Sequence, residues 1–90
     1  MYFDNDTSLY NVIGSNIKYY RKKANLTQAG LADEAKISIS YISKIEAKGC
    51  NKSLSISVLN QIANALNINI IKFFEEVQKN ETYWCLWKNK

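Results

Sequence analysis

The sequence lacks histidine and proline altogether, and it has only three glycines and two cysteines among 90 residues. Without histidine, the commonest general base and metal ligand is missing. No glycine-rich loop could hold a nucleotide phosphate, and no nucleophile stands beside a plausible base. These absences argue against an enzyme, and we predict no catalytic residues, no metal site and no cofactor.

The spacing of the cysteines argues against a disulfide or a zinc site, and the spacing of the apolar residues argues against a membrane span. Cys50 and Cys85 lie far apart, and neither belongs to a CxxC or Cys/His cluster. Free thiols in a reducing cytoplasm are therefore favoured over a disulfide, a zinc site or a redox switch. No apolar run approaches the length of about 20 residues that spans a bilayer, and no charged start precedes an apolar stretch as in an export signal. We predict a cytoplasmic protein without membrane contact.

Ninety residues are enough for one small domain, and the charge of this chain is unevenly distributed. The net charge is +4, but the stretch from Lys18 to Lys52 contains eight basic and three acidic residues, a net charge of +5, and the remainder amounts to −1. A polyanion would be attracted to the basic stretch. A solvated surface rich in lysine would look the same, so charge alone does not decide between the two.

Because proline is absent, helix ends have to be inferred from caps and from apolar periodicity. The most informative stretch runs from Leu26 to Glu46, where a link too short for anything but a tight turn separates two amphipathic patterns. Thr27 and Ser38 are suited to cap these two helices. The arrangement is the signature of a DNA-binding helix-turn-helix. Further helices are expected from about Leu9 or Ile13 to Ala24, from Ser55 onward, and from about Ile70 to Glu76.

The chain resembles the lambda-repressor-like, Cro-type (XRE) family of helix-turn-helix regulators in three segments that follow in one register: IGSNIKYYRKKANLTQ, GLADEAKISISYISKIE and SISVLNQIANALNI. The resemblance runs from about Ile13 to Phe74. It implies an all-α domain of five helices that binds double-stranded DNA and regulates transcription. Two features depart from the family. The stretch between Glu46 and Ser55 is longer than in many members, and Gly30 is expected in mid-helix, at a cost of about 0.5–1 kcal/mol relative to alanine.

The resemblance also implies roles for individual residues. Gln28 is similar to the family's phosphate-contacting glutamine, and the backbone amides at this helix start reinforce the contact. Arg21 and Glu46 stand where the family pairs an arginine of the first helix with a glutamate ending the third, which would fix the angle of the recognition helix. Tyr41 could reach a phosphate or pack against the first helix.

The remaining predicted contacts are divided between base reading and phosphate binding. Base edges would be read by residues on the outer face of the third helix: Ile39, Ser40, Ser43 and Lys44. Phosphates would be held by residues in the following loop: Lys48, Asn51, Lys52 and Ser53. Each of these loop residues, taken singly, is nearly as consistent with an ordinary solvated turn.

The predicted DNA-binding domain covers residues 9–76, with extensions at 1–8 and 77–90. The aromatic tail ETYWCLWKNK alternates as a short strand would, and two tryptophans are too apolar to leave in solvent. The tail therefore packs on its own domain, on a second subunit or on another protein. The fifth helix adds an apolar strip. The predicted homodimer interface consists of Ile71, Phe74, Trp84 and Trp87.

The leading functional hypothesis is a sequence-specific regulator, either a dimeric repressor or a controller. It would bind a pseudo-palindromic operator through the helix at residues 38–46. The alternative is an antitoxin-like interaction module that also binds its own operator while the aromatic tail occupies a protein partner.

Overall fold

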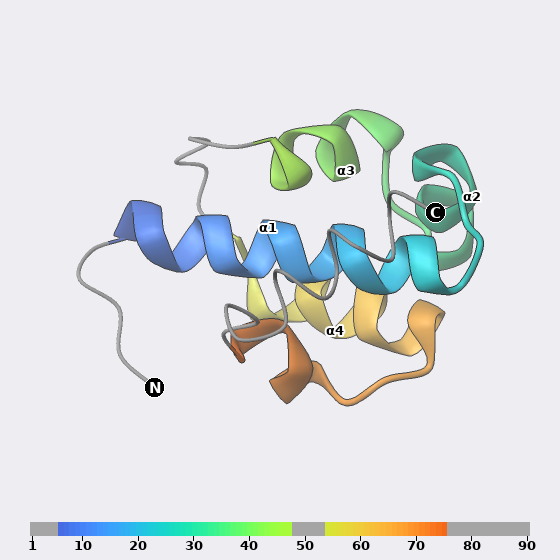
Figure 1. Cartoon of the computed structure of the whole chain (residues 1–90). Coiled ribbons are helices and arrows are strands. Elements are labelled where there is room, and N and C mark those ends of the chain that lie inside the picture. Colours follow the sequence, from blue (N-terminus) through green and yellow to red (C-terminus); the bar gives the residue numbers. More distant parts are fainter. Residues whose placement is uncertain (1–5, 48–53, 76–90) are drawn as a thin grey trace, which may run out of the picture.

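The computed structural model describes residues 6–47 and 54–75, and all of its regular elements are helical. They follow in the order α1 (Asp6–Lys23), α2 (Gln28–Ala35), α3 (Ile39–Glu46), α4 (Ile56–Leu66) and the 3-10 helix η1 (Ile70–Phe74). Helix α1 crosses the middle of the molecule, with α3 on one side and α4 and η1 on the other (Figure 1). Within the described ranges, none of the helices has the length and apolar character needed to cross a membrane.

Polar N-cap residues start three of the helices, and a residue in the left-handed conformation ends three of them. The N-caps of α2, α3 and α4 each accept a bond from the backbone N–H three residues on, at 2.9–3.1 Å: Thr27, Ser38 and Ser55. At the ends of α1, α2 and α4, one residue adopts the left-handed conformation with φ near 60°: Asn25, Lys36 and Asn67. The two N–H groups after each helix then bond to carbonyls of its last turn. These local bonds define the helix limits.

The all-α class is confirmed, but the prediction of a fifth α-helix over residues 70–76 is wrong. The segment forms a short 3-10 helix that is started by Asn69, whose side chain accepts from the N–H of Ile71 at 3.0 Å. Its end is held by Asn16 of α1, whose Nδ2 donates to the carbonyls of Phe73 at 2.7 Å and Glu75 at 2.8 Å. The helical geometry ends at Glu75, whose backbone is extended with φ −80° and ψ 134°.

Two other expectations about helix limits also need correction. Helix α1 begins at Asp6, before either predicted start, and its last helical residue is Lys23. Gly30 is not in the middle of a helix but is the third residue of α2, where its N–H donates to the hydroxyl of Thr27. The glycine therefore lies in the capped first turn.

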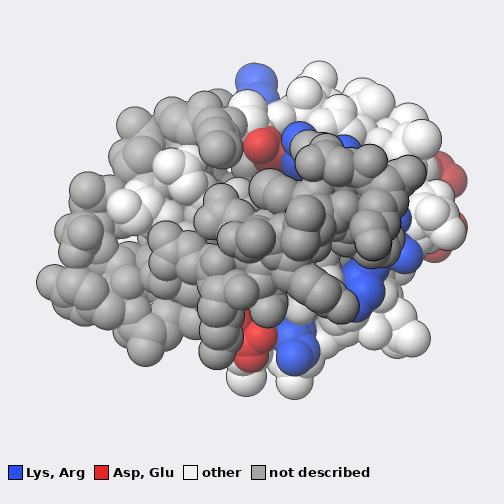
Figure 2. Space-filling model, in the orientation of Figure 1, with Lys and Arg blue, Asp and Glu red and all other residues white. Residues whose placement is uncertain are grey.

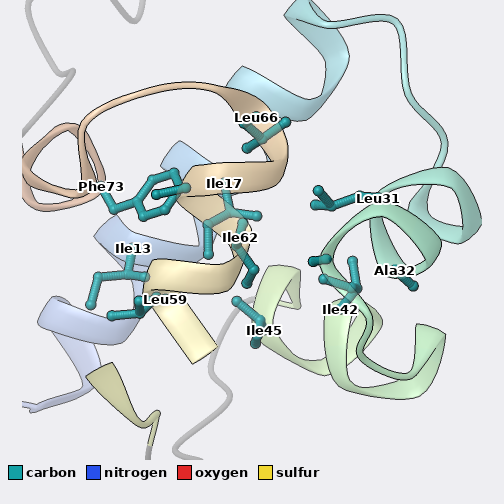
Figure 3. Packing of buried hydrophobic residues seen from close by; sticks show 12 residues of the cluster. Ile13, Ile17, Leu31, Ala32, Ile42, Ile45, Leu59, Ile62, Leu66 and Phe73 are labelled. Atoms are coloured by element: carbon teal, nitrogen blue, oxygen red, sulfur yellow. The ribbon is translucent and has the colours of Figure 1, made fainter. Parts of the chain in front are cut away.

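Twelve buried apolar residues form one core to which every element contributes. Phe73 of η1 is fully buried, and its side chain lies beside Ile17 of α1 in the close view (Figure 3). The other members come from α2, α3 and α4, so both helices of the helix-turn-helix are anchored through their inner faces. The cluster consists of Ile13, Ile17, Leu31, Ala32, Ala35, Ile42, Ile45, Leu59, Ile62, Ala63, Leu66 and Phe73.

Candidate nucleic-acid interface

Helices α2 and α3 form a helix-turn-helix in which α3 presents one face to solvent. The connection consists of Lys36 in the left-handed conformation, Ile37, and the N-cap Ser38. The inner residues of α3, Ile42 and Ile45, are buried in the core. The outer residues are exposed, with Ile39 at 49% of its full surface, followed by Ser40, Ser43 and Lys44. This face offers hydroxyls, one ammonium group and one apolar side chain.

The position of α3 relative to α1 is fixed at its C-terminal end by an ion pair. Arg21 donates through Nε to Oε2 of Glu46 at 2.7 Å and through Nη2 to Oε1 at 3.0 Å. The two side chains are 8% and 2% exposed, so both charges lie almost entirely out of water. Nη1 of Arg21 also donates to the carbonyl of Leu26 at 2.8 Å, which adds the chain between α1 and α2 to the same cluster. The fork geometry therefore joins three segments.

Gln28, the predicted phosphate ligand, belongs to this cluster as well. Its Nε2 donates to Oε1 of Glu46 at 3.1 Å. Within the described part of the chain, its second N–H and its carbonyl oxygen have no partner, and the side chain is half-buried at the first position of α2. The amide thus has one anchored donor and one donor available to a ligand.

The backbones of α1 and α3 approach closely at Gly14, a residue that the sequence analysis did not single out. A Cβ atom at Gly14 would collide with the carbonyl oxygen of Ile45, and it would lie 3.6 Å from Cα of Glu46. The absence of a side chain therefore allows α3 to lie against α1. A glycine inside an otherwise good helix pattern was the available signal.

Exposed lysines are found on α1 and α3, whereas exposed acidic residues are found on α2. Lys18 and Lys23 of α1 and Lys44 of α3 are exposed. Figure 2 shows blue surface near α3 and over the C-terminal part of α1, and red surface at the right-hand edge beside α2. Asp33 and Glu34 are the acidic residues on that helix. The described charge distribution suits a polyanion that lies along α3 and the end of α1.

The other predicted site residues are packed against the core, exposed, or outside the described residues. Tyr41 is half-buried and packs against the core, as does Phe74, whereas Ile71 is 59% exposed. No three or more metal-ligating side chains gather among residues 6–47 and 54–75. The predicted positions that lie outside the described residues are Lys48, Asn51, Lys52, Ser53, Trp84 and Trp87, together with both cysteines.

Comparisons with known proteins agree with this geometry. Residues 17–73 match the HTH_3 helix-turn-helix family. The immunity repressor protein of Bacillus phage phi105 is 43% identical over 58 residues, which are 64% of this chain and 39% of the repressor. The transcriptional regulator SinR of Bacillus subtilis strain 168 is 30% identical over 70 residues, 78% of this chain and 62% of SinR. The chain thus matches less than two thirds of the length of either relative.

Two solved structures are similar in both fold and sequence. The structure of the biofilm master regulator SinR in complex with DNA has a TM-score of 0.65 at 30% identity, covering 70% of this chain and 98% of that one. The restriction-modification controller protein C.Esp1396I has a TM-score of 0.66 at 31% identity, covering 79% and 88%. The chain therefore belongs to the HTH_3 family, the Cro-type (XRE) DNA-binding transcriptional regulators with the lambda-repressor-like fold.

Proposed function

We propose that this protein is a sequence-specific repressor or controller that reads an operator through α3. The observation that carries this proposal is the contrast between the two faces of α3. Its inner face and C-terminal end are fixed by the core and by the Arg21–Glu46 pair, while residues 6–47 and 54–75 leave its outer face exposed. A helix held in this way can enter the major groove as a rigid unit.

The contacts divide into base reading and phosphate binding. Ser40 and Lys44 lie one turn apart on the outer face of α3 and supply the hydrogen-bonding groups, and Ser43 lies on the same exposed face. Ile39 offers only an apolar surface, which suits the methyl group of thymine. Gln28 would hold a phosphate beside α3. The loop residues Lys48, Asn51, Lys52 and Ser53 would grip the flanking backbone, and Tyr41 would serve mainly as packing.

The proposed regulator acts as a two-fold dimer in the cytoplasm. Ile71 on η1 is exposed beside the half-buried Phe74, and a second copy would cover this strip, with Trp84 and Trp87 of the tail extending the interface. A closed dimer with recognition helices about 34 Å apart would match two half-sites one turn apart, and hence a pseudo-palindromic operator. SinR bound to DNA and the controller C.Esp1396I support a regulatory role for this domain.

DNA binding is tested with sequences selected from a random duplex pool. Affinity should fall steeply between about 50 and 200 mM salt, because lysine contacts release counterions from the phosphates. Lys44→Ala should weaken binding to the selected operator by about 1–3 kcal/mol and binding to unrelated DNA by less. Lys52→Ala should weaken both equally. Affinity that does not change with salt would refute DNA binding of this kind, and equal losses for Lys44→Ala would show that Lys44 only positions the protein.

Dimerisation is tested by the mass in solution at tens of micromolar protein, roughly the range of a working dimer. Ile71→Glu should convert the dimer to a monomer that retains its helical content. Ile39→Glu is the matched control, since it places the same charge on another exposed isoleucine and should leave the mass unchanged. A monomeric wild type would contradict the dimer without affecting the DNA-binding proposal.

A further inference from the structure

Glu46 is in contact with more groups than a simple ion pair requires. Its two carboxylate oxygens accept three bonds, two from Arg21 and one from Nε2 of Gln28. Arg21 is bonded to both oxygens, so the pair would be satisfied without the glutamine. The bond from Gln28 is therefore extra to the link between α1 and α3, and it joins α3 to the first residue of α2.

We propose that Glu46 is a positioning residue for DNA contact: it holds the amide of Gln28 so that a phosphate donor is ordered before DNA arrives. This inference depends on the proposed function. An amide nitrogen carries two hydrogens, and when one is directed at Oε1 of Glu46 the orientation of the other is restricted. The side chain of Glu46 is only 2% exposed and is bonded to Arg21 through both oxygens, so the anchor is itself held in place.

The charge on Glu46 makes this arrangement suited to an anion on the far side of the amide. The carboxylate accepts a charge-assisted bond, which polarises the amide, and Arg21 offsets the negative charge. Ordering the side chain beforehand removes an entropy cost from DNA binding, since a free glutamine would lose its rotamer freedom only in the complex. The phosphate contact and the reading helix would then form one rigid unit, because Glu46 is the last residue of α3.

Gln28→Met tests the contact, since methionine keeps the length and the helix propensity but removes the amide. We expect the affinity for operator and for unrelated DNA to fall about tenfold, as for a lost hydrogen bond to a charged group. The slope of affinity against salt should stay the same, because a neutral side chain releases no counterion. Gln61→Met is the matched control. Gln61 is exposed on α4, and its amide has no partner in residues 6–47 or 54–75, so neither affinity nor melting temperature should change.

The role of Glu46 is tested by repeating Gln28→Met in the background of Glu46→Gln, which keeps the size of the side chain but replaces one acceptor oxygen with a donor. If Glu46 orders the amide, Gln28→Met should cost less than threefold in this background, a coupling typical of groups in one network. A tenfold loss in both backgrounds would overturn the inference, because Gln28 would then act independently of Glu46. No loss in the wild-type background would also overturn it.

A measurement on the free wild-type protein keeps the inference testable if Glu46→Gln does not fold. NMR relaxation of the side-chain amides should show Gln28 as rigid as the backbone and Gln61 mobile on the nanosecond scale. Equal mobility of the two amides would refute the positioning role. If wild type binds selected DNA but these results fail, only this inference is lost; if wild type binds no duplex DNA, the proposed function fails and this inference with it.

Discussion

Asn16 is a buried polar residue whose removal should destabilise the protein strongly. It is completely buried, and its Nδ2 donates to the carbonyls of Phe73 and Glu75. Asn16→Ala would leave both carbonyls without this donor, and an unsatisfied buried group costs about 1–3 kcal/mol. The same substitution removes Oδ1, which has no partner among the described residues and is itself a cost. The net loss should be about 2–4 kcal/mol.

For a domain of this size, a loss of that magnitude should lower the melting temperature by roughly 10–30 °C. Urea unfolding and thermal unfolding followed by circular dichroism measure both quantities. Asn60→Ala is the control, because Asn60 is exposed on α4 and its removal should change stability by no more than about 0.5 kcal/mol. If Asn16→Ala behaves like Asn60→Ala, the two bonds contribute nothing net and the account of how η1 is held is incorrect.

Three further changes test the close helix contact, the turn and the pH dependence. Gly14→Ala should destabilise the protein by about 1–3 kcal/mol, because the added methyl group meets the backbone of α3. Gly30→Ala should have a small effect, because the methyl group there meets only side chains. Similar urea midpoints for the two variants would contradict this prediction. Lys36→Gly should stabilise by about 0.5–1 kcal/mol, since glycine relieves the left-handed strain, and Lys36→Ala should not, which separates strain from charge in the same assay. Burial raises the pKa of Tyr20 above its ordinary value. Above about pH 10 the phenol of Tyr20 ionises in the unfolded chain before it ionises in the folded protein, so the free energy of unfolding should decline as the pH rises further. Tyr20→Phe should show a smaller decline above about pH 10, and an equal decline would refute the assignment.

The parts of the fold that local chemistry determines could be predicted from the sequence. The N-caps Thr27, Ser38 and Ser55 act on N–H groups three residues away, and the alternation of inner and outer residues on α3 follows from helical periodicity. The family resemblance to the same segments agrees with the HTH_3 match over residues 17–73. These signals identify the helix-turn-helix of α2 and α3, whereas the individual DNA-contacting residues on it stay predictions.

Contacts between distant residues could not be predicted in the same way. Asn16 and Phe73 are 57 positions apart, and no local pattern in either segment reveals that the side chain of Asn16 bonds to the end of η1. A polar residue between Ile13, Ile17 and Tyr20 on the inner face of α1 was a usable signal, because a buried amide needs partners. The bond from Gln28 to Glu46 was not predicted either, since resemblance suggested separate roles for these two residues.

Helix α1 connects the candidate DNA interface to the proposed dimer surface through two opposite faces. Gly14 and Arg21 are seven residues apart and therefore share one face, which contacts α3. Asn16 and Tyr20 share the opposite face, where Asn16 holds η1 and the ring of Tyr20 lies 6.4 Å from that of Phe73. Figure 1 shows the same arrangement, with α3 and η1 on opposite sides of α1. Since a packed core resists small displacements, the distance from α3 to η1 is set by buried residues of α1. In a dimer formed through η1, this distance would determine the spacing between the two recognition helices, and hence which half-site separation the protein accepts.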